Sequence, residues 1–325
     1  MKSFENISNN PYFNLAFEEY CLSHLPSDDT FFILWQNAPA VIIGKNQDVF
    51  QEVDCQYAHE NGIQLVRRIT GGGAVYHDLG NLNISIMGNY HLHPDYAEEY
   101  GTWICEALRT IGLKSVEMNG RNDLYVDGKK ISGWAKRIQG DSFLLHGTLL
   151  FDVDLEQLVR VLQTKNSKMH KKAVQSVRSV VQNIKEILPF ASMEEMKMAL
   201  DKVMKGNDER VPLRDDELAI INEMVTTKYK TDSWIYNLDF VPTFTRSFHT
   251  CCGYITLNVL LQENSISRVQ FKGDFLGNKD TEELSQLLIG VEWNEPSLRE
   301  ATSPVKIDDY FTGLTNEEFI TLIYQ

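Results

Sequence analysis

The chain of 325 residues is poor in cysteine and has no long apolar run. Its five cysteines, at positions 21, 55, 105, 251 and 252, are odd in number and form no C-x-x-C motif, so we expect neither a disulfide framework nor a zinc site. No apolar run approaches membrane-spanning length, and the first ten residues lack the hydrophobic core of a signal peptide. These absences predict a reducing, cytoplasmic location.

Basic residues are also in the minority, with 31 Lys and Arg against 45 Asp and Glu, for a net charge of −14. This balance argues against a general nucleic-acid or membrane-surface binder, but a local cationic site can still hold a small anion. Neither G-x-G-x-x-G nor G-x-x-x-x-G-K-[ST] occurs, which argues against a dinucleotide-binding fold and a P-loop. The length allows one large domain and a small one.

The most informative stretch runs from Arg67 to Met87, RRITGGGAVYHDLGNLNISIM. Three consecutive glycines remove every Cβ from a turn, so the backbone can approach a ligand closely and adopt positive φ. Exposed amide N–H groups in such a turn suit an anion. Apolar residues lead into the turn, and Leu82, Ile84 and Ile86 alternate with polar residues after it. We therefore expect a glycine-rich loop between two strands.

Periodicity and turn residues predict the remaining elements. We expect a helix starting at Asn10-Pro11, a strand pair over 31–35 and 41–44, and helices over 53–60, 96–111, 155–162, 192–204 and 217–230. Asp127-Gly128 is a strong hairpin signal within a predicted antiparallel meander over 114–151. After a linker over 240–250 we expect strands at 254–261 and 266–271, then helices over 281–290 and after Thr315. Residues 164–182, basic and rich in serine, are interpreted as a mobile loop over a pocket.

Three polar clusters are expected to converge from separate strands: Arg67/Arg68 with the glycines, Arg121-Asn122-Asp123, and Lys129/Lys130. Cations and exposed N–H groups suit phosphate, and the oxygens of Asp123 and Asn122 suit Mg²⁺. A carboxylic acid activated by ATP needs such a set, because positive charge neutralises the attacking carboxylate and the leaving pyrophosphate.

Structural interpretations of the same residues remain open at this point. Neighbouring strand residues face opposite ways, so one arginine of Arg67/Arg68 is expected to be a structural or solvated cation, and Arg68 is favoured as the ligand. The glycines can form a simple turn, Asp123 can cap one, and Glu18 can pair with a surface lysine. Trp35 is expected in the core or in a pocket wall. Histidines such as His77 and His146 are more often structural than catalytic.

Other candidate reactive groups are weaker. Cys55 and His59 share a helical face, but a catalytic pair there has little support. His91-x-His93 lacks a third ligand nearby, so we expect no metal site at these two histidines. The vicinal pair Cys251-Cys252 lies beyond the predicted linker and is expected to be inert.

Taken together, these motifs closely resemble those of bacterial lipoate–protein ligases. The matching pieces, in family order, are FNLAFEE, LWQN, VIIGKNQ, RRITGGGAVYHDLGN, GRNDL, GKKISGWA, HGTLL and SVRS, which cover about the first 180 residues. The resemblance implies an α+β fold, with a mixed, largely antiparallel sheet flanked by helices, as in biotin and lipoate ligases and class II synthetases. It also implies a catalytic domain over 1–245 and a small α/β accessory domain over 251–325.

The resemblance implies a two-step reaction. Lipoate and Mg-ATP give lipoyl-AMP and pyrophosphate, and the lipoyl group then passes to a lysine of a lipoyl domain, such as those of 2-oxo acid dehydrogenase complexes or glycine cleavage H protein. We expect a monomer that binds neither nucleic acid nor membrane. One alternative is an octanoyl or lipoyl transferase of the same fold, but residues 114–151 contain no cysteine for its thioester. A non-catalytic lipoate or nucleotide binder is another, and biotin ligase is a weaker one.

The resemblance also assigns residues. The expected positions are Lys130 for catalysis; Arg68, Gly73, Ala74, Val75, Tyr76, Asn81, Lys130, Ser176 and Arg178 for ATP; Glu18, Trp35, Arg68, Thr70, Gly73, His77, Lys130 and His146 for lipoate; and Asp123 and Asn122 for magnesium. Trp134 is a departure, because this family usually has a small residue there. It is expected to narrow the acyl pocket or to meet the acceptor.

Overall fold

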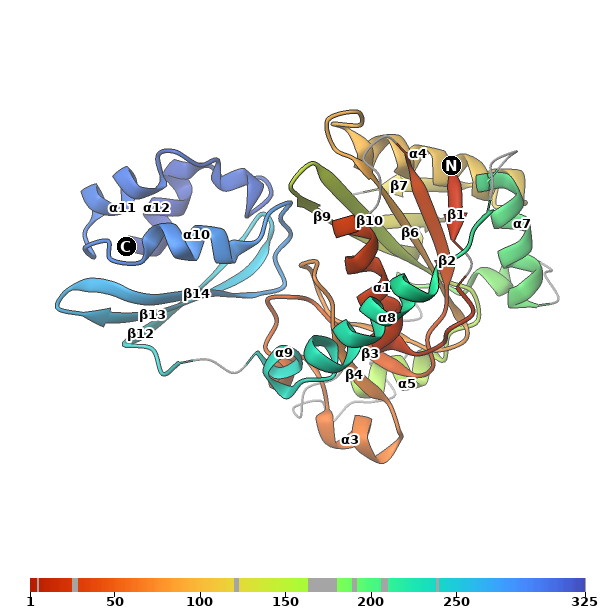
Figure 1. The fold of residues 1–325 in the computed structure, drawn as a ribbon, viewed down its shortest axis with the longest axis horizontal. Helices are drawn as coiled ribbons and strands as arrows, with labels where there is room; N and C mark the ends of the chain where they lie inside the picture. Colours follow the sequence, from red (N-terminus) through yellow and green to blue (C-terminus); the bar gives the residue numbers. More distant parts are fainter. Residues whose placement is uncertain are drawn as a thin grey trace.

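In the part of the chain that the structure describes, eight strands form the main sheet (Figure 1). The computed structural model describes residues 1–4, 6–24, 29–119, 123–162, 180–188, 192–205, 210–237 and 240–324. Within them the strand order is β11 (Arg210–Val211), β1 (Lys2–Phe4), β2 (Phe31–Trp35), β6 (Asn81–Asn89), β10 (Ser142–Leu150), β9 (Lys129–Gln139), β8 (Asp123–Val126) and β7 (Val116–Asn119). Strands β11, β1 and β2 run parallel and the others antiparallel, so the mixed, largely antiparallel sheet is confirmed.

Helices cover both faces of this sheet, because both faces of its strands are apolar. On β2, Phe31, Ile33 and Trp35 join a core with α1 (Pro11–His24) and α8 (Asp215–Met224). Phe32 and Leu34 point the other way, into a core with α4 (Tyr96–Thr110) and α7 (Met193–Lys205). Strand β2 therefore reads as a continuous apolar run, as expected for a strand buried on both sides.

A second, smaller sheet carries the glycine-rich loop. Strand β3 (Ala40–Ile43) lies between β4 (Gln64–Arg67), which is parallel to it, and β5 (Val75–His77), which is antiparallel. The predicted pairing of 31–35 with 41–44 is therefore wrong, because the two strands belong to different sheets and the second has two partners of its own. The predicted position of the glycine-rich loop between two strands is confirmed, because the loop connects β4 to β5. The short strand β5 was not anticipated.

Buried Arg67 ties this small sheet to its surroundings. Its guanidinium donates to the carbonyl oxygens of Gly44, Lys45 and Gln47 at 2.8–2.9 Å. It also donates to those of Trp234 and Ile235 on α9 (Asp232–Tyr236) at 2.7–2.9 Å. With 1% of its surface exposed, Arg67 is a structural cation, as the strand alternation predicted for one of the two arginines.

The predicted meander over 114–151 is confirmed as the run β7-β8-β9-β10. Asp127 and Gly128 both have positive φ, 51° and 77°, as the tight turn between β8 and β9 requires. The short helices are α2 (Val49–Glu52), α3 (Cys55–Glu60) and α5 (Leu155–Val161). The side chain of Asp154 caps α5, as expected. Helix α8 continues into a π-helical turn over Val225–Tyr229.

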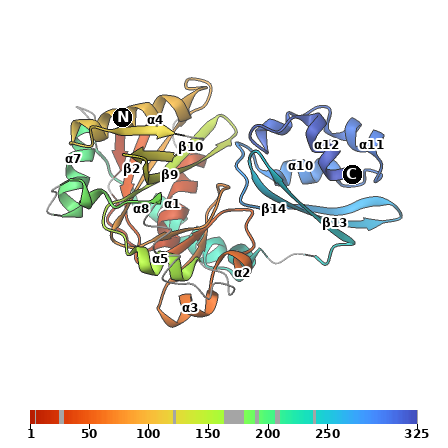
Figure 2. The same ribbon diagram turned by 180° about the vertical axis from the view of Figure 1, so that it is seen from behind.

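The C-terminal part forms its own layer of helices on a three-stranded sheet, as Figure 2 shows from behind. Its strands are β12 (Phe244–Thr250), β13 (Gly253–Gln262) and β14 (Ser265–Gly273), and its helices are α10 (Thr281–Leu288), α11 (Glu295–Thr302) and α12 (Asn316–Tyr324). The predicted linker over 240–250 is wrong for 244–250, because these residues pair with β13 and alternate in burial. The cap of the last helix by Thr315 with Glu318 is confirmed.

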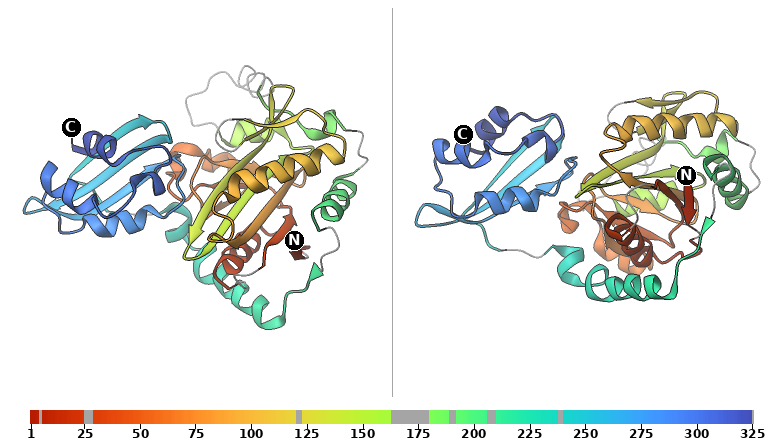
Figure 3. Two further views of the ribbon diagram at one scale, coloured as in Figure 1. Left: turned by 90° about the horizontal axis from the view of Figure 1, so that it is seen from above. Right: turned by 45° about the horizontal axis from the view of Figure 1, so that its top comes forward.

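The two parts of the molecule meet along the glycine-rich loop and the end of β9 (Figure 3). Backbone hydrogen bonds join Gly72 N to the carbonyl of Phe275 (3.1 Å), Gly273 N to that of Asn46 (2.8 Å) and Ile138 N to that of Asn278 (2.8 Å). Gly71 must be glycine here, because a Cβ would lie 2.8 Å from the carbonyl oxygen of Phe275. Among the helices described, none is both long and apolar enough to cross a membrane.

Replacement of Arg67 tests its structural role. We expect Arg67→Met to lower the free energy of unfolding by about 3 kcal/mol, because several buried carbonyl groups lose their donor together. Denaturant unfolding measures this difference. Arg214→Met is the control, since that side chain is 67% exposed and its ion pair lies in water. An equal effect of both substitutions would contradict the role given to Arg67.

Candidate active site

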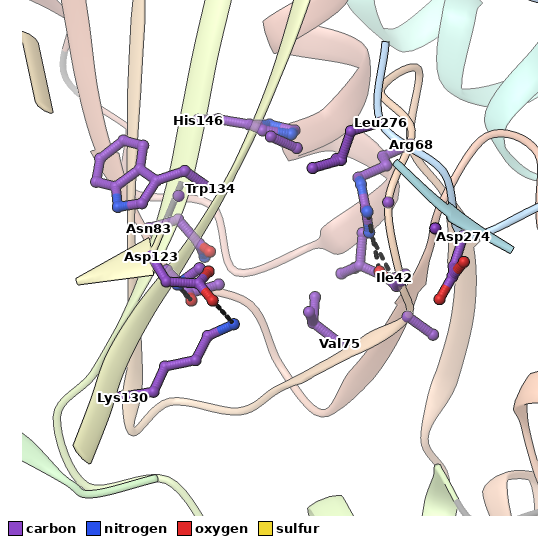
Figure 4. Close-up of a pocket in the computed structure, with 18 of the residues that line it drawn as sticks. Ile42, Arg68, Val75, Asn83, Asp123, Lys130, Trp134, His146, Asp274 and Leu276 are labelled. Atoms are coloured by element: carbon purple, nitrogen blue, oxygen red, sulfur yellow. Dashed lines mark hydrogen bonds and ion pairs between the residues drawn. The ribbon is translucent and has the colours of Figure 1, made fainter. Parts of the chain in front are cut away.

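A cavity of about 530 Å³ lies between the two sheets of the N-terminal part and the C-terminal part. Its walls come from β2, β3, β5, β6, the hairpins β8-β9 and β9-β10, the glycine-rich loop, and two turns of the C-terminal part. Figure 4 shows Asp123 and Lys130 on one side of the cavity and Arg68, Leu276 and Asp274 on the other. The volume falls in the range of small-molecule sites.

Arg68 holds the glycine-rich loop in shape from inside. Its guanidinium donates to the carbonyls of Gly71 (2.6 Å) and Gly73 (2.9 Å), and to that of Ile42 (3.1 Å). Gly72 between them has φ of +91°, a conformation that favours glycine. Burial lowers the pKa of Arg68 to about 10, so the group is still charged at neutral pH. The loop thus presents a fixed positive charge and a bare backbone to the cavity.

A second cation lies across the cavity on the β8-β9 hairpin. Lys130 Nζ forms an ion pair with Asp123 at 2.8 Å, and both side chains are about one-third exposed. Gly133 leaves room for them, since a Cβ there would lie 3.2 Å from Lys130 Nζ. Lys130 and Asp123 are therefore accessible to a ligand and already paired with each other.

A chain of buried polar groups runs behind the cavity wall from Arg68. Arg68 Nε donates to Thr70 Oγ1 (2.9 Å), which lies 2.8 Å from His146 Nε2. His146 Nδ1 lies 2.9 Å from Glu18 Oε1, and Glu18 also accepts from the Ser85 hydroxyl at 2.5 Å. Glu18 is 1% exposed, so its interpretation as a surface partner for a lysine is wrong. The neighbouring Glu19, whose side chain is 17% exposed, pairs with a lysine instead, Lys228 at 2.7 Å.

His77 lies near Trp35, with ring centroids 6.2 Å apart at 69°. Its Nδ1 is 3.1 Å from Asn37 Nδ2. Burial, with the nearby Arg68 and His146, lowers the pKa of His77 to about 3, so the ring is uncharged at neutral pH. Its Nε2 has no hydrogen-bond partner among the residues that the structure describes.

The C-terminal part supplies one wall of the cavity, which the sequence did not reveal. Residues 249–253 of the β12-β13 turn line it, together with Asp274 and Leu276. Leu276 reaches the glycine-rich loop, because a Cβ on Gly72 would lie 3.2 Å from its Cδ2. The pair Cys251-Cys252, which the sequence placed beyond the linker and which was expected to be inert, borders the cavity. These residues are separated from the glycine-rich loop by more than 170 positions, and no local motif marks them.

An ion-pair cluster closes the interface beside the cavity. Asp280, at the N-cap of α10, pairs with Lys45 and, at 3.2 Å, with Arg137. Its side chain is only 14% exposed. Arg137 also donates to the carbonyl of Ile69 at 2.9 Å, next to the glycine-rich loop. One carboxylate of the C-terminal part is therefore shared by two basic side chains of the N-terminal part.

The predicted site residues fall into three groups. Those that line the cavity are Trp35, Arg68, Gly73, Ala74, Val75, His77, Asp123, Lys130 and His146. Those that lie behind its wall are Glu18, Thr70, Tyr76 and Asn81. Glu18 and Thr70 belong to the buried polar chain. The side chain of Tyr76 packs in a core with Val41 and Val49, and Asn81 donates to Asn83 at 3.0 Å. Outside the described residues lie Arg121, Asn122, Ser176, Arg178 and most of the predicted loop 164–182.

Trp134 borders the cavity, but its ring packs with Ile84, Leu145 and Leu149 in the core facing α4. This is the face of the sheet opposite to His146. The ring covers Gly147, where a Cβ would lie 2.2 Å from Trp134 Cδ2. The departure from the family pattern at 134 is thus accommodated by a bare backbone position on the neighbouring strand.

The remaining candidates lie elsewhere. Cys55 does not line the cavity, and its Sγ lies 3.7 Å from the carbonyl of Val53. His91 and His93 lie near separate carboxylates, those of Asp141 and Glu99. Within the described ranges, no group of three His, Cys, Asp or Glu side chains is placed to hold a metal ion.

The low pKa of His77 predicts an acid-labile contribution to stability. The unfolded chain binds a proton at this group near pH 6.5, whereas the folded protein does so only near pH 3, so stability is lost as pH falls through that window. Between pH 6.5 and 4.5 the loss should be roughly 2–3 kcal/mol. We expect His77→Gln to lose less stability than the parent over this range in denaturant unfolding. Equal losses would show that His77 titrates normally in the folded protein.

The ion-pair cluster at Asp280 should hold the two parts together. Asp280→Ser keeps a helix cap but removes the carboxylate, so Lys45 and Arg137 lose their shared partner. We expect the variant to have a larger radius of gyration in small-angle X-ray scattering, because the interface opens. Lys279→Ala is the control, since its pair with Asp309 lies within the C-terminal part. Unchanged scattering of Asp280→Ser would rule out this closing role.

Comparison with known proteins identifies the family. The lipoyl protein ligase A/B catalytic domain matches residues 10–205, and the bacterial lipoate protein ligase C-terminus matches residues 242–323. Lipoate-protein ligase LplJ of Bacillus subtilis is 35% identical, over 97% of both chains. Lipoate–protein ligase 1 of Staphylococcus aureus is 34% identical, over 98% of this chain and 99% of its own.

Solved structures agree. Plasmodium falciparum LipL1, solved with lipoate, superposes with a TM-score of 0.78 at 20% identity, covering 99% of this chain and 96% of its own, and so supports the fold. A bipartite lipoate protein ligase of Thermoplasma acidophilum, studied with its E2 lipoyl domain, gives 0.65 at 28% identity and covers 74% of this chain and 98% of its own. A lipoate-protein ligase A bound with ATP gives a TM-score of 0.63 at 27% identity, and the match covers 73% of this chain and 99% of its own. The chain belongs to the lipoate–protein ligase family and has both its catalytic domain and its bacterial C-terminal domain.

Proposed function

We propose that this lipoate–protein ligase works in two steps within the cavity between its two parts. In the first step, a carboxylate oxygen of lipoate attacks the α-phosphorus of ATP, the bond to the β-phosphate breaks, and pyrophosphate leaves. In the second step, the ε-amine of an acceptor lysine attacks the acyl carbon of lipoyl-AMP, AMP leaves, and the amine loses a proton. The nucleophile of each step comes from a substrate, so the enzyme's task is positioning and charge stabilisation.

One observation carries this proposal: two cations face one cavity from different strands, next to a glycine-rich loop. Lys130 is accessible and paired with Asp123, while Arg68 sits inside the loop 71–73. A substrate carboxylate or phosphate can replace Asp123 as the partner of Lys130. Lys130 then holds the acyl carboxylate next to the phosphate, where negative charge accumulates as the adenylate forms.

The remaining proposed contacts follow from position. Gly73, Ala74 and Val75 line the cavity and can face the nucleotide, while Trp35, His77 and His146 border the acyl side. Glu18 and Thr70 act behind the wall, by holding His146 and Arg68 in place. Tyr76 and Asn81 support the fold of the loop and of β6. Asn122, Ser176 and Arg178 remain proposed nucleotide-side residues.

Magnesium fits the donor set present. The Asp123 carboxylate is a hard oxygen ligand inside the cavity, and Mg²⁺ is commonly held by one or two carboxylates together with substrate phosphates. We propose Asp123, with Asn122, as its protein ligands. When bound, Mg²⁺ would supply positive charge that neutralises the phosphate oxygens.

We further propose the acceptor and setting. The solved relative studied with an E2 lipoyl domain supports lipoyl domains as acceptors. We propose that they belong to 2-oxo acid dehydrogenase complexes or to glycine cleavage H protein. We propose a cytoplasmic monomer. With a net charge of −14, the chain gains no general electrostatic attraction for an acidic acceptor, so a local patch must guide docking.

A thioester transferase has one observation in its favour, because Cys251 borders the cavity. Its thiol faces the carbonyl of Gly313 at 3.1 Å, and no described base contacts it. If the chain used a thioester on Cys251, Cys251→Ser would abolish transfer of the acyl group. If the chain is a ligase, transfer requires ATP, and Cys251→Ser keeps this ATP-dependent activity.

Exchange of labelled pyrophosphate into ATP tests the first step. Wild-type protein should catalyse this exchange only when lipoate is present. Lys130→Ala should reduce it about a hundredfold, because a charge that stabilises the reacting groups is lost. Lys129→Ala is the matched control, because consecutive side chains of β9 point to opposite faces of the sheet. This substitution should change the rate by less than about twofold. Normal exchange in Lys130→Ala would overturn the proposed mechanism.

A further inference from the structure

One row of residues crosses the main sheet along a wall of the cavity. Asn83 on β6 lies opposite Trp35 on β2 and Thr148 on β10. Gly133 on β9 lies opposite Asp123 on β8, and its backbone N–H donates to Thr148 Oγ1 at 3.3 Å. All five residues border the cavity, and Figure 4 shows Asn83 on the same side of it as Asp123. Thr148 is therefore in the middle of this row, one strand away from Gly133.

A β-bulge brings Lys130 to the same wall. Two consecutive residues of β8 pair with Ser132 and Lys130, so Ile131 between them is an extra residue in β9. Residues three positions apart on a regular strand face opposite ways, and the extra residue puts Lys130 on the same face as Gly133. A Cβ on Gly133 would lie 3.2 Å from Lys130 Nζ, so the ammonium group lies directly over this glycine. Lys130 thus reaches the row at the position next to Thr148.

The side chain of Thr148 offers a hydroxyl group to the cavity. Between residues 143 and 150 of β10, Thr148 alone is partly exposed and the others are buried. It shares the face of His146, which also borders the cavity. Since β6 and β9 cover both edges of β10, the exposed surface of Thr148 is surface that the cavity opens. Its Oγ1 accepts from the N–H of Gly133, and in the described part of the chain its O–H has no acceptor.

The ammonium group and the hydroxyl group are spaced to bind one oxygen atom together. Residues directly opposite on antiparallel strands have Cβ atoms about 5 Å apart. Because Lys130 Nζ lies over the Cβ position of Gly133, it is roughly 5 Å from the side chain of Thr148. An oxygen atom between the two donors can accept a hydrogen bond of about 2.8 Å from each. On the other side of Thr148, Asn83 already donates to the carbonyl of Trp35 at 3.3 Å.

We propose that Thr148 is a catalytic residue of the transfer step, and that its O–H and the ammonium group of Lys130 together bind the acyl oxygen of lipoyl-AMP. This inference rests on the proposed function, because it places the acyl group at Lys130. When the acceptor amine attacks the acyl carbon, one electron pair of the C=O bond moves to this oxygen. The pair returns as the bond to AMP breaks, AMP leaves with the electrons of that bond, and the amine proton passes to water. Thr148 keeps its own proton throughout.

The two steps should depend on Thr148 differently. In the first step, the carboxylate of lipoate loses charge as it attacks phosphorus, so a hydrogen bond to it stabilises the bound acid more than the transition state. In the second step, negative charge builds up on the acyl oxygen, so the same hydrogen bond is stronger in the transition state. Thr148 should therefore lower KM for lipoate in the first step and raise the rate of the second.

The test separates these steps with Thr148→Val, which has nearly the same shape but no O–H group. Single-turnover transfer from synthetic lipoyl-AMP to an unmodified E2 lipoyl domain measures the second step, and exchange of pyrophosphate into ATP measures the first. We expect the transfer rate constant to fall about a hundredfold, as for the loss of one donor to an oxyanion. In exchange, KM for lipoate should rise about tenfold while kcat changes less than about twofold. Thr148→Ser keeps the hydroxyl group and should retain most of the transfer rate.

Further variants serve as controls. Thr245 on β12 has an exposed hydroxyl group that donates to Asn258 at 2.8 Å, and it does not border the cavity. Thr245→Val should therefore leave both steps unchanged. Thr148→Ala and Thr148→Ser differ by the oxygen atom, so this pair gives the same comparison if the valine variant does not fold.

The outcomes separate the two proposals. No lipoate-dependent exchange, or no transfer from lipoyl-AMP, by the wild-type protein would refute the proposed function. Normal transfer by Thr148→Val, when the wild type performs both steps, would overturn the role of Thr148 alone. An equal fall of kcat in both steps, or a loss that Thr148→Ser shares, would also overturn it, because Thr148 would then only hold the N–H of Gly133 in place. Slow transfer with unchanged exchange kcat, restored in Thr148→Ser, supports the hydrogen bond to the acyl oxygen.

Discussion

The arrangement of the active site depends on one buried cation. Arg67 gathers the carbonyl groups of the loop 44–47 and of helix α9, and so fixes the strand that leads into the glycine-rich loop. Since neighbouring side chains on a strand face opposite ways, a fixed Arg67 directs Arg68 into the cavity. There Arg68 binds carbonyls of the loop itself. Two adjacent arginines therefore perform different tasks: one joins the loop to the core, and the other gives the loop its shape and charge.

Buried polar groups extend this order across the site. The chain from Arg68 through Thr70 and His146 to Glu18 links the glycine-rich loop to helix α1, which packs on the cavity-facing side of the main sheet. Each member has its hydrogen bonds satisfied, as a buried network must to be stable. The walls of the cavity are therefore organised before a ligand binds, and pre-organised groups need little rearrangement when charge develops during reaction.

Local patterns were sufficient for much of the fold and part of the site. The meander with its Asp127-Gly128 turn, helix α1 and the capped helices follow from turn and capping chemistry, which depends on adjacent residues alone. Strand partners depend on distant residues, and for this reason the pairing of 31–35 with 41–44 was wrong. The linker prediction over 240–250 failed for a similar reason, because β12 is half-exposed and shows little apolar periodicity.

The sequence by itself determined the family, the main elements, and the residue types that face the cavity, because motifs such as RRITGGGAVYHDLGN and GKKISG combine charge, glycine and strand alternation within short spans. Only the tertiary structure decided that the C-terminal part closes the cavity with residues 249–253 and Leu276. It also decided that Glu18 is buried and that Nε2 of His77, near Trp35, has no hydrogen-bond partner among the described residues. These features depend on contacts between residues far apart in the chain, and no local pattern encodes such contacts.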